Sequence, residues 1–216
     1  MKALVVYCHP NPASFNGAVL KSVIDALEQA DAEYVVIDLY REGFQPALNL
    51  HDWQAYEDCT CNTKGLERHV EAVGWCDTLL FVYPTWWYGL PALLKGWCDR
   101  VLVPGVAFDM PDGGNIKPGL SHITRLGVFT TCGASRWLTF FVGAPGKRTL
   151  LRGIGLLCAR RCKTAFAAHY LMDASTEKTR QRHLKRVERK MRRLLGLRKG
   201  PVEGLVRKTR TQEPTI

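Results

Sequence analysis

Two hydrophobic patterns alternate along this chain. Short continuous apolar runs, rich in β-branched and aromatic residues, indicate strands that are buried on both faces. Segments whose apolar residues recur every three or four positions indicate amphipathic helices. The predicted strands span residues 3–7, 34–39, 78–83, 126–131 and 164–170. The predicted helices span residues 19–27, 66–73, 91–101, 149–158 and 176–195. This alternation predicts an α/β fold of the doubly wound class, with a five-stranded parallel sheet and helices on both faces.

Chain length and the position of the last helix suggest the domain organisation. With 216 residues, the chain is long enough for one well-buried core. Residues 1–195 are predicted to form one domain, and residues 196–216 a basic, flexible tail. No apolar run approaches the ~20 residues of a membrane span, and Cys8 and His9 interrupt the first run where a signal peptide would continue. We therefore expect a cytoplasmic protein without a membrane span.

The formal net charge of +10 raises the question of nucleic-acid binding. Residues 178–210 contain fourteen Lys or Arg and two Glu, so we assign the basicity to the C-terminus alone. Most of these charges lie between the apolar positions of the last predicted helix, which indicates a solvated face. Because no nucleic-acid motif accompanies them, a nucleic-acid partner is not expected.

The eight cysteines are scattered and lack the spacing of a disulfide scaffold or a zinc site. Free thiols are therefore expected, and no metal site is predicted. The spacings of Cys59 with Cys61 and of Cys158 with Cys162 leave a redox or metal-ligand pair as the lesser alternative.

Loops that follow predicted strands carry the candidate chemistry, because doubly wound sheets bind ligands outside the carboxyl ends of their strands. The first loop, residues 9–16, offers the Ser14 hydroxyl, the Asn16 amide and the N–H groups that begin the next helix. Such a loop suits a phosphate group. It lacks the glycine patterns of a classical dinucleotide fold and of a P-loop.

The second loop, residues 84–91, places Trp86, Trp87 and Tyr88 directly after a buried strand. A stiff aromatic wall suits a flat heteroaromatic ring, and the same residues would equally suit a core or a dimer interface. The third loop, residues 130–135, consists of small and hydroxyl-bearing residues that allow a ligand to approach the backbone closely. All three loops are expected to converge on one crevice.

Residues 5–16 and 81–101 resemble the NAD(P)H:quinone oxidoreductase family of flavodoxin-like flavoproteins, and the resemblance extends in order over residues 1–170. It implies a flavodoxin-like fold and three groups of flavin contacts. The cofactor phosphates would contact His9, Ser14, Phe15 and Asn16. The isoalloxazine ring would lie against Pro84, Thr85, Trp86, Trp87 and Tyr88. Its polar edge would lie beside Thr130, Thr131, Cys132 and Gly133.

The resemblance also implies an activity. Family members take electrons from NAD(P)H and pass them to a quinone or similar small aromatic acceptor in a two-step exchange on the flavin. The chain length favours FAD over FMN, and a homodimer is expected. The alternative is a flavin-binding ancillary or regulatory subunit of a partner such as a transport protein. Residues 134–146 lack the Tyr and His that assist hydride transfer in animal members, so we assign no catalytic acid or base.

Other residues have two interpretations each. His169 and Tyr170 could reach a substrate, although a structural role is the more common one at a strand end. Cys8 could be a reactive thiol or a small buried filler, with the filler favoured. Lys147 and Arg148 could bind the phosphate of NADPH or simply begin a helix. The remaining histidines are expected at the surface, namely His51, His69, His122 and His183.

Overall fold

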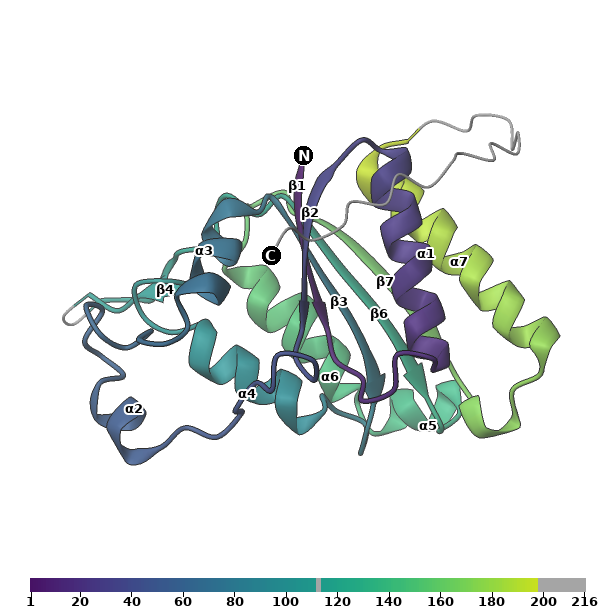
Figure 1. Cartoon of the computed structure of the whole chain (residues 1–216), viewed down its shortest axis with the longest axis horizontal. Helices are drawn as coiled ribbons and strands as arrows, with labels where there is room; N and C mark the ends of the chain where they lie inside the picture. The colour runs from purple at the N-terminus through teal and green to yellow at the C-terminus, as the bar shows by residue number, and fades with distance from the viewer. Residues whose placement is uncertain (112–113, 198–216) are drawn as a thin grey trace, which may run out of the picture.

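Five parallel strands form the central sheet in the computed structural model, which describes residues 1–111 and 114–197. They are β1 (Lys2–Tyr7), β2 (Glu33–Asp38), β3 (Thr78–Thr85), β6 (Arg125–Cys132) and β7 (Lys163–His169). Their order is β2-β1-β3-β6-β7, and each neighbouring pair is parallel (Figure 1). Each of the five was predicted from its apolar run, and the predicted doubly wound sheet is confirmed.

Helices cover both faces of this sheet (Figure 1). One face packs against α1 (Phe15–Gln29) and α7 (Glu177–Leu195). The other packs against α3 (Glu67–Trp75), α4 (Ala92–Val101) and the helical segment that begins with α6 (Pro145–Arg148). The apolar positions spaced at three and four residues are the ones buried against the sheet, such as those of α7.

Two strands run further than the sequence predicted. β3 includes Pro84 and Thr85, and β6 includes Cys132, so these residues belong to strand ends rather than to loops. A proline is unexpected in an inner strand because it has no N–H to donate. Here β1 ends its pairing opposite Val82, so beyond that residue only β6 pairs with β3. Pro84 therefore lies where one edge of the strand is free.

Several short elements were missed. They are α2 (Leu50–Gln54), α5 (Arg136–Phe141) and the antiparallel pair of β4 (Phe108–Asp109) and β5 (Lys117–Pro118). The helix predicted at 149–158 begins earlier, at Pro145, and changes to a π-turn at Thr149–Gly153 and a 3-10 turn at Ile154–Leu156. Pro91 precedes α4 instead of lying in its first turn.

Two of the four histidines expected at the surface are buried. His69 accepts a hydrogen bond at Nδ1 from Trp97 Nε1 at 3.2 Å. His183 packs with its ring centroid 5.9 Å from that of Phe15. Their helices bury histidines at positions where the sequence pattern alone does not distinguish an imidazole from an apolar ring.

The C-terminal prediction lies largely outside the described residues. α7 ends at Leu195, followed by Gly196 in a left-handed conformation with φ of 75°. A tail from residue 196 therefore stays a prediction, since the description stops at residue 197. Within residues 1–111 and 114–197, no helix has both the length and the apolar character needed to span a bilayer.

Candidate functional site

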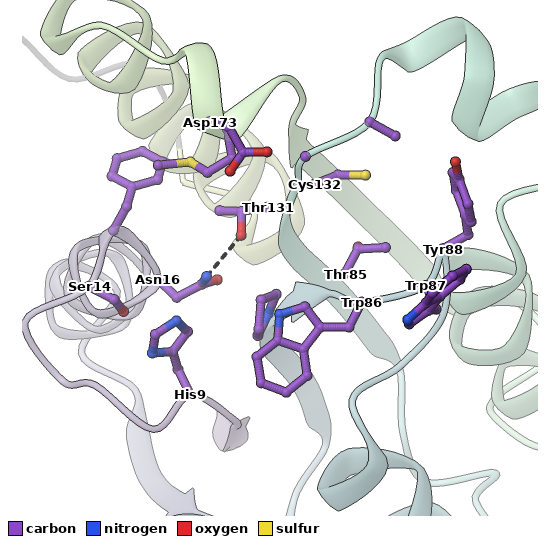
Figure 2. Close-up of a pocket in the computed structure, with 15 residues that line it drawn as sticks. His9, Ser14, Asn16, Thr85, Trp86, Trp87, Tyr88, Thr131, Cys132 and Asp173 are labelled. Carbon is purple, nitrogen blue, oxygen red and sulfur yellow. Dashed lines mark hydrogen bonds between the residues drawn. The ribbon is translucent and has the colours of Figure 1, made fainter.

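The main pocket opens at the carboxyl ends of the strands and has a volume of about 820 Å³. Figure 2 shows side chains from several segments pointing toward this space. Its lining residues are His9, Ser14, Phe15, Asn16, Pro84, Thr85, Trp86, Trp87, Tyr88, Thr131, Cys132, Gly133, Ala134, Met172 and Asp173. The three predicted loop regions therefore converge on one pocket, as the topology of a doubly wound sheet requires.

The first wall of the pocket is the N-terminus of α1. Ser14 caps the helix, and its Oγ accepts a hydrogen bond from the Gly17 N–H at 3.3 Å. The N–H groups of Phe15 and Asn16 have no acceptor among the described residues. Because these groups lie at the positive end of a 15-residue helix, they can bind an anionic group.

The loop before α1 packs tightly against the helix. A Cβ atom on Gly17 would lie 2.0 Å from the carbonyl oxygen of Pro12, so only glycine fits there. Nδ1 of His9 lies 3.0 Å from the Asn11 nitrogen and 2.9 Å from the Asn11 carbonyl oxygen, which anchors the ring in either tautomer. Burial lowers the pKa of His9, so the imidazole is neutral near pH 7.

The second wall is a tight turn that displays aromatic rings. The Gly89 N–H donates to the Trp86 carbonyl at 2.9 Å, which closes a four-residue turn. The two central residues, Trp87 and Tyr88, both have positive φ, at 48° and 62°. A left-handed conformation costs roughly 1–2 kcal/mol for a residue with a Cβ. Trp87 is nevertheless 95% exposed, so little burial offsets this strain in the absence of a ligand.

The third wall is the end of β6, and it is joined to the other two. Asn16 Nδ2 donates to Thr131 Oγ1 at 2.9 Å, and both residues are buried (Figure 2). Thr85 and Thr130 hydroxyls lie 2.8 Å apart, which links β3 to β6. Side-chain hydrogen bonds thus join α1, β3 and β6 around the pocket.

A carboxylate approaches the pocket from the turn that follows β7. Asp173 lies in a 3-10 turn, Met172–Ala174, and a Cβ atom on Gly133 would come within 2.8 Å of its Oδ2. The close approach explains why a glycine follows Cys132. Ala134, Met172 and Asp173 were not predicted as site residues, because they follow strands without a recognisable motif.

Among the predicted site residues, Thr130 is the one that does not line the main pocket. It lines a smaller adjoining cavity instead, and its hydroxyl holds Thr85 in place. Lys147 and Tyr170 line the same small cavity, with the Lys147 Nζ 4.8 Å from the ring centroid of Phe166.

Two further alternatives are resolved in favour of a structural role. Cys8 is fully buried, and burial raises the pKa of its thiol to about 12, the opposite of what a reactive thiol requires. His169 is buried and lies behind the pocket wall, with its ring 5.3 Å from Phe15 and 5.2 Å from His183. All eight cysteines are free.

Comparison with known proteins assigns the chain to a family. Residues 1–191 match the model of a family described as having a flavodoxin-like fold. The chain belongs to the flavodoxin-like family. Its pocket accordingly occupies the switch point of a flavodoxin-like sheet, between β1 and β3, where such folds bind ligands.

Similar flavodoxin-like proteins include named quinone oxidoreductases. Ribosyldihydronicotinamide dehydrogenase (quinone) from Rattus norvegicus is 32% identical over 158 residues, which cover 64% of this chain and 66% of that protein. A Streptococcus mutans protein of known structure is 30% identical with a TM-score of 0.79, covering 89% of this chain and 100% of that one. The NAD(P)H:quinone oxidoreductase from Methanothermobacter marburgensis is 26% identical with a TM-score of 0.76, covering 90% and 98%. The resemblance drawn from the sequence is thereby confirmed. The chain spans just under two thirds of the length of the first curated relatives.

Proposed function

We propose that this chain is a flavin-dependent NAD(P)H oxidoreductase that reduces quinones or similar small aromatic acceptors. The observation that carries the proposal is the pairing of two features in one pocket. Unbonded N–H groups at the start of α1 suit a phosphate, and the aromatic turn across from them suits a flat ring. A flavin nucleotide has both a phosphate and a flat heteroaromatic ring.

The residues present fit this cofactor. The phosphate would lie against His9, Ser14, Phe15 and Asn16, where a neutral imidazole and helix N–H groups can donate hydrogen bonds. The ring would lie against the segment from Pro84 to Tyr88 and beside Thr131, Cys132 and Gly133. Thr130 would contribute through Thr85. Asp173 adds a carboxylate acceptor beside Gly133 in the same pocket. We favour FAD over FMN on the chain length alone.

When bound, a flavin would supply the redox chemistry, a two-step transfer of a hydride from NAD(P)H to the acceptor. The chain's own residues position the reactants. The exposed Trp86 and Trp87 would flank the ring, and donor and acceptor would stack in turn on the open face of the ring. Backbone N–H groups near Gly133 can stabilise negative charge that develops at the polar edge of the ring. No side chain is assigned as catalytic acid or base.

A homodimer and a cytoplasmic location complete the proposal. Exposed Leu50 and Trp53 on α2 form a surface suited to self-association. This surface holds the ion pair of Asp52 with Arg100, so two copies can meet there without net repulsion. Free thiols throughout the chain suit a reducing compartment.

The test is an absorbance spectrum of the purified protein before and after anaerobic addition of NADH or NADPH, with the released cofactor identified by mass. A flavin spectrum that bleaches, followed by recovery on adding a quinone, supports the proposal. Trp86→Ala, in the pocket, is expected to weaken flavin binding, whereas Ile116→Ala, at an exposed site outside the pocket, serves as the control. A protein that stays colourless with FAD and with FMN would refute the proposal. Flavin binding without turnover would favour the ancillary-subunit alternative.

A further inference from the structure

Helix α5 buries a polar residue and exposes its large aromatic residues, the reverse of the usual pattern. Its one buried residue is Thr139, whose Oγ1 donates to the Ser135 carbonyl at 2.9 Å. Three large aromatic residues point the other way: Trp137 is 71% exposed, Phe140 78% and Phe141 75%. The rings of Trp137 and Phe141 stack on each other, 5.6 Å apart and 12° from parallel. Exposed aromatic rings gathered on one short helix usually mark a surface that contacts something apolar.

Basic residues lie on α5 itself and on the next short helix. Arg136 begins α5, and Lys147 and Arg148 belong to α6, which directly follows the loop of residues 142–144. The Arg148 Nη1 reaches back to that loop, where a Cβ atom on Gly143 would lie 3.4 Å from it. Within the part of the chain that the structure describes, none of the three cations takes part in an ion pair.

The wider sequence around α5 is basic as well. Residues 113–172 contain nine Lys or Arg and no Asp or Glu, whereas acidic residues dominate residues 1–112. The prediction that basicity belongs to the C-terminus alone was therefore wrong. The negative net charge of residues 1–112 cancels the positive net charge of residues 113–172 when the charge outside the C-terminus is summed.

The charge of the α5 surface indicates what kind of partner it fits. A second copy of the same surface would bring Arg136 and Arg148 against their own counterparts, which is repulsive. The α2 surface, in contrast, carries both signs of charge. Aromatic rings flanked by Lys and Arg are the composition of peptide segments that lie in the interface of an anionic bilayer. We propose that the α5 surface, Trp137, Phe140 and Phe141 with Arg136 and Arg148, docks onto anionic lipid membranes.

Docking there would bring the pocket to the membrane. α5 follows directly after Gly133 and Ala134 of the pocket wall and lies at the carboxyl ends of β3 and β6 (Figure 1). The fully exposed Trp87 lies on the same pocket. If the proposed function holds, the acceptor is a quinone dissolved in the lipid, and it enters from the bilayer. The docking itself depends only on the α5 surface.

Vesicle flotation tests the docking with the full-length protein. Wild-type protein is expected to float with vesicles of phosphatidylglycerol and phosphatidylcholine, and less with phosphatidylcholine alone or at high salt. The combined variant Trp137→Ser, Phe140→Ser, Phe141→Ser is expected to lower the partition coefficient by about tenfold or more. Met110→Ser with Ile116→Ser, exposed apolar residues beside β4 and β5, is expected to leave it unchanged.

Charge variants separate the α5 surface from other basic regions. Arg136→Gln with Arg148→Gln is expected to lower the partition coefficient by about fivefold for each cation, whereas Lys185→Gln with Arg189→Gln on α7 has little effect. Circular dichroism checks that each variant is folded.

Absence of flotation by the wild type overturns the proposal. So does flotation that survives both α5 variants, which would assign the binding to residues 198–216. A smaller oligomer in the aromatic variant, without lipid binding by the wild type, would identify a contact between copies instead. Because flotation needs neither flavin nor NAD(P)H, its failure is distinct from failure of the proposed function.

Discussion

The hydrogen bond from Asn16 to Thr131 joins the phosphate-loop wall to β6, and its energy can be measured by a double-mutant cycle. Asn16 is 3% exposed and Thr131 is 4% exposed, so water cannot replace either partner. Thr131→Val keeps the shape but leaves the Asn16 amide as a buried donor without its acceptor. That loss costs about 1–3 kcal/mol. For a chain of this length, each kcal/mol lowers Tm by about 2–4 °C.

The cycle compares Asn16→Ala, Thr131→Val and the double variant by urea unfolding without cofactor. Each single variant breaks the same bond, so the two losses of stability should overlap. The double variant should therefore be more stable than the sum of the two single effects predicts, by about 1 kcal/mol or more. Thr78→Val, at the opposite end of β3, is the control and should be additive with Asn16→Ala within about 0.5 kcal/mol. Additivity of the Asn16 and Thr131 effects would refute the reasoning that this bond joins the two walls.

Three further predictions concern glycine packing, pH and backbone strain. Gly17→Ala should lower flavin affinity at least about tenfold, measured by titration, because its Cβ would collide with the Pro12 carbonyl. As a control, Gly74→Ala, whose Cβ would have nothing within 4 Å, should stabilise α3 by about 0.5–1 kcal/mol. Burial lowers the pKa of His183 to about 4, below the value of about 6.5 expected when unfolded. The stability that depends on a neutral His183 is therefore fully present above about pH 6.5 and is lost as pH falls toward 4. Urea unfolding should show a loss on the order of 3 kcal/mol over that window, and His183→Leu should abolish most of it. Trp87→Asn should stabilise the flavin-free protein by about 1 kcal/mol, because Asn tolerates positive φ and the ring is exposed, yet it should weaken flavin binding. Unchanged affinity in Gly17→Ala, a flat pH profile in the wild type, or lower stability in Trp87→Asn would contradict the respective reasoning.

The strands and the convergence of the site could be predicted because both follow from local pattern and topology. Each apolar run, such as the one ending at Tyr7, has to be buried on both faces of a parallel sheet. Once the strands are parallel, the segments that follow them meet at one edge of the sheet. His9 and Trp86, far apart in sequence, therefore line the same pocket.

The features that escaped prediction depend on distant contacts or run against local preference. Asp173 enters the pocket because Gly133 lets its carboxylate approach, a contact between two strand ends that neither sequence segment encodes alone. Tyr88 adopts a positive φ that a large residue disfavours, so its local sequence argues against the turn that it forms. α5 was missed because Phe140 and Phe141 face outward, which leaves no amphipathic pattern directed at the core.

The walls of the pocket are made at very different times during synthesis. Ser14 lies near the start of the chain, whereas Asp173 follows the last strand of the sheet. At ribosomal rates of 5–20 residues per second, the later wall emerges on the order of ten seconds after the earlier one. The helix N-terminus at Ser14 thus exists well before there is a pocket for it to serve. The pocket is complete only once β7 and the turn after it have joined the sheet, so a chain stalled before Asp173 would leave the ribosome without a complete pocket.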